Sequence, residues 1–381
     1  MPSHIRGCIL KITDIKTIAL KIPLKERSPV SYYPNRRRVH ILVEVSTDEG
    51  IKGYGESIPY TYGSVGGYIE QQLKPLLVGE NPFHVERLWD KAYRASFGHG
   101  IRGISLYALS AVEVALWDII GKARKLPVYE MLGGLCRDKI KAYASLMEYR
   151  KPEEVGVISV QWAEQGYKAV KIHQGRKDAV ESTKAVRDAV GDDLEIMLDV
   201  NGAWTPMEAI KHAKTLERYD LTWLEEPIWP VDDYGSLARL REKTSIPIAG
   251  GENEHTHHGF RNLITQNAVD IVQPDVIMTG GISTCKKIIA MAEAWNLGIA
   301  THSFFFGPGV PASVHLSLSN MTSEWVEINA VPLEAFFIKP AYRPVDGYVT
   351  APDKPGLGFE IDWDVVEKYA VKESPTGSLY Y

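Results

Sequence analysis

Ionisable residues recur at a nearly constant spacing in the C-terminal half of the chain, each at the end of a short apolar run. The series is His173, Asp199, Glu225, Glu252, Asp275, His302 and Glu327. The successive gaps are 26, 26, 27, 23, 27 and 25 residues, about the length of one strand, one helix and two loops. In a parallel (β/α) barrel all strands open onto one face. The spacing therefore predicts a barrel on which seven ionisable groups converge.

Strand patterns precede helical patterns in the N-terminal third of the chain. Residues 9–22 alternate apolar and polar side chains, as in a half-buried strand. The segment 39–57 reads as a hairpin with its turn at 48–50. Helical patterns follow around 68–77, 84–96 and 104–124. The last of these is apolar nearly all round, which indicates a buried helix, and the order of elements predicts an α+β unit.

The C-terminal two thirds of the chain alternate strands and helices. Eight apolar runs from about Lys139 onward read as strands. The helical patterns between them include 179–190, 206–217, 235–243 and 282–295. A chain of 381 residues is long for one core and suits a barrel with a smaller domain. We predict an α/β fold whose parts are an α+β domain over 1–132, a barrel over 133–345 and a tail over 346–381 that packs on the first domain.

Composition limits the class of protein. The hydrophobic content of 45%, the charged content of 24% and the net charge of -5 are ordinary for a globular protein and provide no basic face for nucleic acid. Three widely spaced cysteines without a CxxC motif fit a reducing cytosol. No stretch approaches the ~18 apolar residues of a membrane span, and the N-terminus lacks a signal-peptide pattern. We expect a cytoplasmic protein with no nucleic-acid or membrane partner.

Three carboxylates, Asp199, Glu225 and Glu252, follow three successive predicted strands. Converging carboxylates repel one another unless a cation lies between them. Each could instead cap a helix or pair with a surface lysine, but their common register favours a shared ligand. Because all three offer oxygen, we predict a hard cation, Mg²⁺ before Mn²⁺.

Candidate bases stand on both sides of this cluster. Lys171 and His173 are two residues apart on one strand, so both point into the barrel. Asp275 and His302 follow the sixth and seventh strands. A carboxylate bound to one imidazole nitrogen raises the basicity of the other, which favours a dyad over a satisfied core histidine. A cation flanked by bases suggests removal of an α-proton from a carboxylate substrate, with the resulting enediolate stabilised by the metal.

These residues resemble the enolase superfamily, and specifically its mandelate racemase subgroup. The motifs that carry the resemblance are GYKAVKIHQG, LDVNG, WLEEP, GGE, QPD, the histidine after the seventh strand, and WVE. The resemblance implies a modified (β/α)₇β TIM barrel with an α+β capping domain formed by the N-terminal region and the C-terminal tail. In this superfamily a lysine or histidine base works with an enediolate stabilised by one or two Mg²⁺ ions. The resemblance also implies a homo-oligomer, because relatives are commonly dimers or octamers.

The resemblance extends to single residues. Asp199, Glu225 and Glu252 match the ligands of one metal ion in the active site, and Asp275 with His302 matches the family's Asp-His dyad.

Three further residues gain roles in the same way, with one departure from the family pattern. Glu327 matches the glutamate that donates a hydrogen bond to the substrate carboxylate, although Glu324 is a rival. Lys171 matches the first lysine of the KxK motif, which contacts that carboxylate. Asn201, two residues beyond Asp199, lies on the same face by strand alternation and is a second-tier candidate for substrate contact. His173 replaces the second lysine. Whether His173 abstracts a proton, protonates a leaving group or binds a hydroxyl is left open.

The resemblance favours a lyase that dehydrates an acid sugar. Racemisation, epimerisation or lactone cycloisomerisation, which would make the enzyme an isomerase, is the alternative, and a non-catalytic binding barrel is a remote one. Segment 270–285 contains no lysine, which argues against the muconate-lactonising and dipeptide-epimerase branches. Substrate identity should depend on loops near 23–38 and 57–67, with Tyr32 and Tyr33 in the first.

Two other motifs are weaker candidates for binding sites. His255 and His257 form an HxH pattern like that of zinc amidohydrolases, but it follows the fifth strand, so we interpret both as loop residues near the pocket. The turns TGG at 279–281 and GPG at 307–309 precede predicted helices and could meet an anion.

Overall fold

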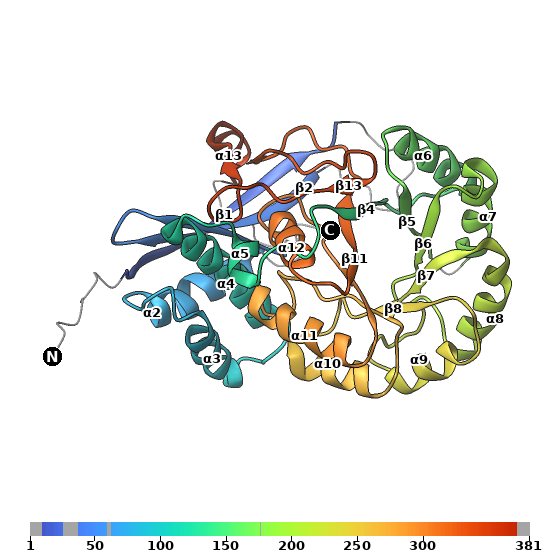
Figure 1. Ribbon diagram of the computed structural model, residues 1–381, viewed down its shortest axis with the longest axis horizontal. Helices are drawn as coiled ribbons and strands as arrows, with labels where there is room; N and C mark the ends of the chain where they lie inside the picture. Colours follow the sequence, from blue (N-terminus) through green and yellow to red (C-terminus); the bar gives the residue numbers. More distant parts are fainter. Residues whose placement is uncertain (1–9, 26–36, 59–61, 176, 372–381) are drawn as a thin grey trace.

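The protein consists of a closed barrel beside a smaller α+β domain (Figure 1). The computed structural model describes residues 10–25, 37–58, 62–175 and 177–371. Eight parallel strands pair in chain order, and β11 pairs with β4 to close the ring. The barrel strands are β4 (Ile140–Ser145), β5 (Ala169–His173), β6 (Glu195–Asp199), β7 (Leu221–Glu225), β8 (Ile248–Gly250), β9 (Ile271–Val272), β10 (Gly298–Thr301) and β11 (Ser323–Asn329). The eight predicted runs and the predicted fold class are confirmed.

Seven helices connect and cover these strands in the described part of the barrel. They are α6 (Pro152–Glu164), α7 (Ala179–Val190), α8 (Pro206–Leu216), α9 (Tyr234–Arg241), α10 (Thr256–Thr265), α11 (Ile282–Ala294) and α12 (Gly309–Leu318). The ends of the four predicted helices lie within two residues of the ends of α7, α8, α9 and α11. The start of α8 is well marked in the sequence, because Thr205 and Glu208 form a reciprocal capping box and Pro206 occupies the first turn. A 3₁₀ turn, Glu217–Tyr219, follows α8.

The barrel interior is filled by one apolar side chain from each strand. These residues are Tyr143, Ala169, Met197, Trp223, Ala249, Ile271, Ala300 and Trp325. Their mixed sizes close the interior, so the barrel is a packed core rather than a pore. Side chains on a strand alternate between two faces. The residues two positions later therefore point into the same interior, one layer nearer the carboxyl ends of the strands.

The α+β domain packs three strands against helices. Its elements are β1 (Ile12–Pro23), β2 (Arg37–Thr47), β3 (Lys52–Ser57), α1 (Tyr62–Tyr68), the π-helical turn Ile69–Leu73, α2 (Lys74–Leu77), α3 (Val85–Ala95), the 3₁₀ turn Ser96–Gly98, α4 (Ile104–Arg124) and α5 (Val128–Leu132). The sheet is antiparallel with the predicted hairpin between β2 and β3. The helical pattern predicted around 68–77 is wrong at its start, because helical structure begins at Tyr62 and passes through the π-helical turn.

Helix α4 lies at the centre of this domain. It packs so closely on β3 that a Cβ on Gly55 would lie 1.9 Å from the carbonyl oxygen of Ala111, and one on Gly53 would lie 2.1 Å from that of Ala115. By length and composition α4 could cross a membrane, which corrects the prediction that no stretch approaches this. However, 83% of its apolar window is buried inside the protein, so core packing accounts for its apolar character.

The C-terminal tail returns to the α+β domain, as predicted. Strand β12 (Ile338–Lys339) precedes the tail, and the tail contains β13 (Tyr348–Val349), β14 (Glu360–Ile361) and α13 (Trp363–Tyr369). The amide of Val371 donates to the carbonyl of Ala19 on β1 at 2.8 Å, and the amide of Leu357 donates to Asp118 on α4 at 3.0 Å. Figure 1 shows α13 beside β1. Domain boundaries at 132/133 and 345/346 stay predictions.

A buried histidine links α12 to α5. His315 is fully buried, and its Nδ1 accepts a hydrogen bond from the amide of Tyr129 at 3.1 Å. Burial disfavours the charged imidazolium and lowers the pKa of His315 to about 4. The unfolded chain therefore binds this proton below its ordinary pKa of about 6.5, whereas the folded chain does not until about pH 4.

This difference predicts that His315 makes the fold acid-sensitive. Stability should fall as the pH drops through the window from about 6.5 to about 4, and by pH 5 the loss from His315 should be about 2 kcal/mol. His315→Asn keeps an acceptor for Tyr129 but cannot titrate, so its free energy of unfolding, measured in urea, should change less between pH 7 and pH 5. The exposed His84 is the matched control, and His84→Asn should keep the wild-type slope. Equal slopes for wild type and His315→Asn would contradict the prediction.

Candidate active site

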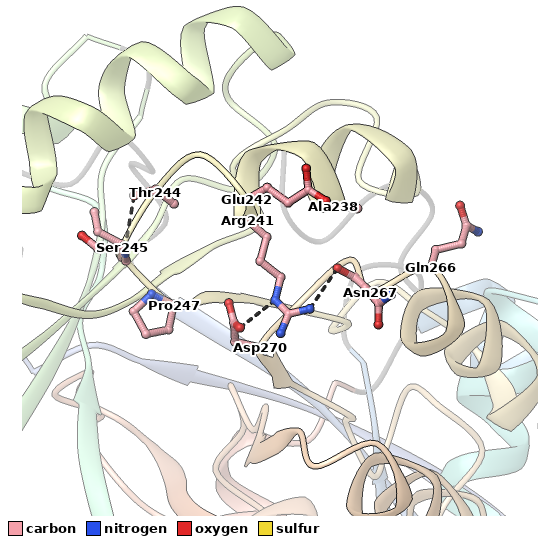
Figure 2. Close-up of a pocket in the computed structure, with 10 residues that line it drawn as sticks. Ala238, Arg241, Glu242, Thr244, Ser245, Pro247, Gln266, Asn267 and Asp270 are labelled. Carbon is pink, nitrogen blue, oxygen red and sulfur yellow. Dashed lines mark hydrogen bonds and ion pairs between the residues drawn. The ribbon is translucent and has the colours of Figure 1, made fainter.

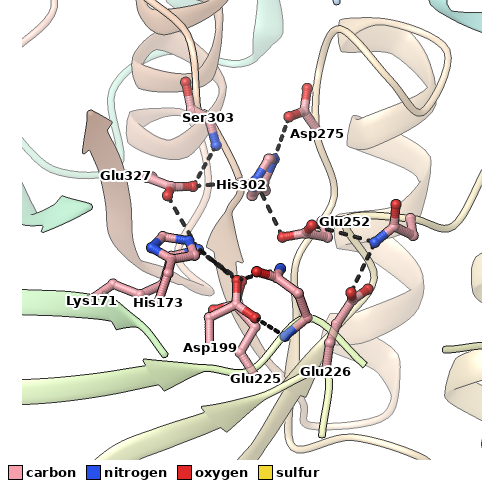
Figure 3. A network of polar contacts seen from close by, with 12 residues as sticks. Lys171, His173, Asp199, Glu225, Glu226, Glu252, Asp275, His302, Ser303 and Glu327 are labelled. Carbon is pink, nitrogen blue, oxygen red and sulfur yellow. Dashed lines mark hydrogen bonds and ion pairs between the residues drawn. The ribbon is translucent and has the colours of Figure 1, made fainter. Parts of the chain in front are cut away.

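A polar layer lies directly above the apolar layer of the barrel interior. The alternation of side chains brings Lys171, Asp199, Glu225 and Glu327 into this layer, and all four are fully buried. His302 occupies the corresponding position after β10. The structure thus brings together every residue that the sequence predicts for the site, as Figure 3 shows for most of them. The strand period of the barrel places Lys171, Asp199, Glu225 and Glu327 in this layer.

Lys171 is the central cation of the layer. Its Nζ lies 2.8 Å from Oε1 of Glu225, 3.2 Å from Oε1 of Glu327 and 3.8 Å from Oδ2 of Asp199. Burial alone would lower the pKa of Lys171, but the charges of Glu225 and Glu327 outweigh it and raise the pKa well above its ordinary value. The lysine is therefore a fixed ammonium that holds three carboxylates.

Asp199, Glu225 and Glu252 form a cluster that fits a hard cation. One oxygen from each can be chosen so that all three lie within 4.8 Å of one another, and among the described residues no other group of this kind occurs. Burial and the neighbouring charge of Asp199 raise the pKa of Glu252 to about 7, although His302 and Lys171 oppose this. Lys171 pairs with two of these three carboxylates, Asp199 and Glu225, and the surplus negative charge of the cluster suits a divalent ion bound through oxygen.

The cluster is oriented by its neighbours. Asn201 donates its backbone amide to Oδ1 of Asp199 at 2.8 Å and its side-chain amide to Oδ2 at 3.0 Å. Trp223 donates its indole N–H to Oε2 of Glu225 at 2.8 Å. Asn201 has a positive φ of 43° in the turn after β6, so its position follows from this turn and not from the strand alternation assumed in the sequence. These bonds fix the directions of the Asp199 and Glu225 carboxylates.

Asp275 and His302 form the predicted dyad. Nδ1 of His302 lies 2.5 Å from Oδ2 of Asp275, and its Nε2 lies 3.2 Å from Oε2 of Glu252. Burial lowers the pKa of His302, but the charges of Glu252 and Glu327 and the hydrogen bond that Nδ1–H donates to Asp275 raise it well above its ordinary value. With Nδ1 held by Asp275, Nε2 is the ring atom that faces the carboxylate cluster.

His173 stands at the other end of the cluster. Its Nδ1 lies 2.6 Å from the carbonyl oxygen of Leu146 and its Nε2 lies 3.3 Å from Oδ2 of Asp199. Its side chain is 17% exposed, compared with 9% for His302. Burial lowers its pKa, but Asp199 outweighs this and raises it. The two imidazoles therefore present Nε2 to opposite ends of the cluster, and they differ in the group that binds Nδ1.

Glu327, and not Glu324, belongs to the site. Glu324 is exposed and lies at the start of β11, whereas Glu327 accepts the amide of Ser303 at 2.8 Å. Burial would raise the pKa of Glu327, but the charges of Lys171 and His302 lower it to about 2. An ionised carboxylate accepts hydrogen bonds and cannot donate one. In this arrangement Lys171 is the group that carries protons toward Glu327, and the donor role implied for Glu327 by the family resemblance stays a prediction.

Sequence reasoning missed three contributors to the site. Glu226 is buried beside Glu225, and its pKa is raised well above the ordinary value by burial and by the charges of Glu252, Asp199 and Glu225. Asn253 donates to Oε2 of Glu226 at 2.8 Å and contacts Glu252 at 3.3 Å. Ser303 is the third. The doubled glutamate in WLEEP and the asparagine after GGE were the available signals.

The HxH motif does not form a second metal site among the described residues. The interpretation of both histidines as loop residues is wrong for His257, which lies in the first turn of α10, while His255 is buried directly before that helix. Helix α10 begins here because the chain turns at Thr256, where φ is 59°. The ring of His255 packs on Tyr107 of α4 at 5.5 Å. His255 therefore contributes to packing between the two domains.

A hollow at the opposite end of the barrel lies where the chain enters β8 and β9 (Figure 2). Its Arg241 is paired with Asp270 at 2.6 Å, so this guanidinium offers no unpaired charge to a substrate.

The predicted specificity loops lie partly outside the described residues, including Tyr32 and Tyr33. From the first loop, Arg38 is described, and its guanidinium lies 4.6 Å from the ring centre of Phe304, which in turn contacts His173 at 5.9 Å.

Comparison with known proteins agrees with this geometry. An arabinonate dehydratase of Saccharolobus solfataricus is 36% identical over 342 residues, which cover 87% of this chain and 91% of that protein. A D-galactarolactone cycloisomerase of Agrobacterium fabrum is 32% identical, with 96% of this chain and 100% of that protein covered. The crystal structure of a racemase from Streptomyces coelicolor A3(2) with bound magnesium superimposes with a TM-score of 0.86 at 28% identity and covers 94% of this chain and 100% of that one.

Family models cover both parts of the chain. The model for the enolase C-terminal domain-like family matches residues 157–365, and the model for the mandelate racemase / muconate lactonizing enzyme N-terminal domain matches residues 15–133. The relatives are named dehydratases and cycloisomerases, so the chain is an enzyme of the lyase or isomerase class. The resemblance seen in the sequence is thereby confirmed, and the chain belongs to the mandelate racemase / muconate lactonizing enzyme family of the enolase superfamily.

Proposed function

We propose that the protein is a cytoplasmic, Mg²⁺-dependent acid-sugar dehydratase. It removes the α-proton of a hydroxy-carboxylate to give an enediolate and then eliminates the β-hydroxyl as water. The observation that carries this proposal is the pair of imidazoles, His173 and His302, at opposite ends of one carboxylate cluster. Elimination needs one group to take a proton and another to give one, and this pair supplies both from different sides.

Asp199, Glu225 and Glu252 would hold the metal, with Mn²⁺ as a possible substitute. When bound, Mg²⁺ supplies positive charge that stabilises the enediolate form of the substrate carboxylate. The all-oxygen donor set and the surplus negative charge of the cluster support this assignment. Lys171, a permanent ammonium in contact with the cluster, would donate to the substrate carboxylate, and Glu327 would keep that lysine in place.

His302 would take the α-proton on Nε2. Asp275 holds Nδ1 at 2.5 Å, and a carboxylate behind an imidazole makes the other nitrogen a stronger base. Burial lowers the pKa of His302, and the charge of Glu252 is the largest effect that raises it. Glu252 is also a proposed metal ligand, so its charge would be shared in the loaded enzyme.

His173 would protonate the leaving hydroxyl. Its Nδ1 is bound by the neutral carbonyl of Leu146 at 2.6 Å instead of a carboxylate, which leaves it the weaker base and the better acid of the pair. Arg38 on Phe304, next to His173, adds a cation near the same end of the site. This lining suits a polyhydroxylated acid.

The alternative is an isomerase, either a lactone cycloisomerase or a racemase that transfers a proton between the two faces of one carbon. The D-galactarolactone cycloisomerase relative, matched over its whole length, favours this reading. The two reactions share proton removal and differ in the product: water is lost only in dehydration. A library of acid sugars, assayed in D₂O with Mg²⁺, separates them by the presence or absence of a 2-keto-3-deoxy product.

The metal proposal predicts a loss of Mg²⁺ affinity in Glu252→Gln, because one of three ligand charges is removed. Calorimetric titration with MgCl₂ should show binding weakened by more than about tenfold, since even outer-shell changes cost this much. Glu324→Gln, an exposed change on β11, is the matched control and should bind like the wild type. Equal affinity in the two variants would rule out Glu252 as a ligand.

The dyad proposal predicts that His302→Asn loses dehydration while it keeps Mg²⁺ binding. Loss of a general base should lower kcat by about 10²–10⁴-fold. The measurement is formation of the 2-keto acid from the best acid sugar of the library, with α-proton exchange into D₂O followed by NMR. Wild-type rates in this variant would refute the role of His302.

His173→Ala separates the two reaction classes. A dehydratase should retain α-proton exchange through His302 but lose expulsion of the hydroxyl by at least about 10²-fold. A racemase should instead lose net inversion at the α-carbon. If the rates of α-proton exchange, elimination and inversion all stay at wild-type values, His173 has no part in the reaction.

A further inference from the structure

The α+β domain contacts the segment after Asp275 through a buried carboxylate. Glu113 on α4 is 1% exposed. Its Oε2 accepts the amide of Ile282 at 2.7 Å, and its Oε1 accepts the amide of Ser283 at 2.9 Å. These amides open α11, where a helix leaves its N–H groups unpaired and its dipole favours an anion. Glu113 therefore fixes the start of the helix that follows the dyad aspartate.

Two more side chains of the α+β domain bind Gly280, two residues before the start of α11. Ser110 accepts the amide of Gly280 with its Oγ at 2.8 Å, and Trp89 donates its indole N–H to the carbonyl of Gly280 at 2.7 Å. Three side chains from α3 and α4 thus hold the backbone at positions 280, 282 and 283. The contact is built across the domain boundary, over a sequence separation of about 170 residues.

The glycines of the TGG turn are required by this contact. Gly280 and Gly281 have φ of 124° and 89°. A Cβ on Gly281 would lie 2.0 Å from Oε2 of Glu113, and one on Gly280 would lie 3.2 Å from Nε1 of Trp89. Only glycine permits both the backbone conformation and the close approach. The anion expected at this glycine turn is therefore intramolecular, the carboxylate of Glu113.

The same turn fixes the carboxylate of Asp275. Oδ1 of Asp275 accepts the amide of Ile277 at 2.7 Å, and the backbone of Asp275 is bonded to Thr279 through the hydroxyl at 3.2 Å and the amide at 2.9 Å. Thr279 directly precedes Gly280. Oδ2 of Asp275 is the atom that contacts His302. A displacement of the turn at 279–281 would therefore move the Asp275 carboxylate, which orients the imidazole of His302.

A second carboxylate of the α+β domain binds backbone amides in the same way at the start of α12, the helix that follows β10 and His302. Glu56 on β3 is buried, and its Oε2 accepts the amides of Gly307 at 2.9 Å and Gly309 at 3.3 Å. A Cβ on Gly307 would lie 2.8 Å from this oxygen. Both helix starts that follow the dyad strands, α11 and α12, are thus held by carboxylates of the α+β domain.

We propose that Glu113 is a positioning residue for the Asp275–His302 dyad, acting through the turn at 279–281. Its effect on turnover rests on the proposed function, whereas its effect on the hydrogen bond between Asp275 and His302 does not. The two effects can be measured separately.

Glu113→Gln is the main test. Glutamine offers one acceptor oxygen in place of two and turns an NH₂ group toward a backbone N–H of α11. In protein labelled with ¹⁵N-histidine, the Nδ1–H resonance of His302, assigned by its loss in His302→Asn, should move upfield or broaden. The kcat for the best acid sugar should fall by about 10- to 100-fold, the scale expected for a small misplacement, with KM and Mg²⁺ affinity unchanged.

Asp118→Asn is the matched control. Asp118 is another buried carboxylate of α4 that accepts two backbone amides, those of Tyr54 and Leu357, each at 3.0 Å, but these lie away from α11. The change should lower the melting temperature and leave the His302 resonance and kcat as in wild type. If Glu113→Gln does not fold, Ser110→Ala, which removes one bond to Gly280, should shift the resonance in the same direction by less.

The outcomes are distinct. A wild-type resonance in the folded Glu113 variant, or in Ser110→Ala where that variant does not fold, overturns the proposal, as does an equal shift in Asp118→Asn. A shifted resonance in an enzyme that enolises no acid of the library supports the positioning role and removes the proposed function.

Discussion

The site depends on one buried ammonium. Asp199, Glu225 and Glu327 are fully buried, and a carboxylate taken out of water without a partner costs several kcal/mol. Lys171 lies within 3.8 Å of all three, so a single side chain on β5 makes it possible to gather them in the barrel. One positive charge does not balance three negative ones. The remaining charge, increased by Glu252, makes the cluster a place for a divalent cation, and it also explains why the neighbouring imidazoles hold their protons tightly.

The sequence predicts this layer well because a strand allows little freedom. Once the 26-residue step indicates a parallel barrel, alternation fixes which side chains point inward, and Lys171, Asp199, Glu225 and Glu327 follow. Prediction is weaker wherever a loop decides. Asn201 and Glu226 have positive φ values of 43° and 40°, so strand alternation cannot place them. The start of α10 at Thr256 is hidden for the same reason. The homo-oligomeric state, dimer or octamer, stays a prediction because no contact within one chain reports on it.

The two imidazoles show how similar groups acquire different chemistry. Both present Nε2 to a carboxylate at about the same distance, 3.3 Å for His173 and 3.2 Å for His302. The group behind Nδ1 differs, since it is a neutral carbonyl for His173 and a carboxylate for His302. An imidazolium is stabilised more by an anion than by a dipole. The asymmetry lies in partners that the sequence spacing cannot resolve, because Leu146 contributes its backbone and not its side chain.

The α+β domain does more than cover the barrel, because its buried carboxylates bind backbone amides of the barrel. Glu113 and Glu56 bind amides that begin α11 and α12. In each case a glycine lies against the carboxylate, where a Cβ would clash with its oxygen. The alternative for these amides is water or a capping side chain from the barrel itself. Because the barrel instead takes these caps from the other domain, the positions of the segments after β9 and β10 depend on contacts between the two domains. The dyad is therefore a product of both domains, although both of its members belong to the barrel.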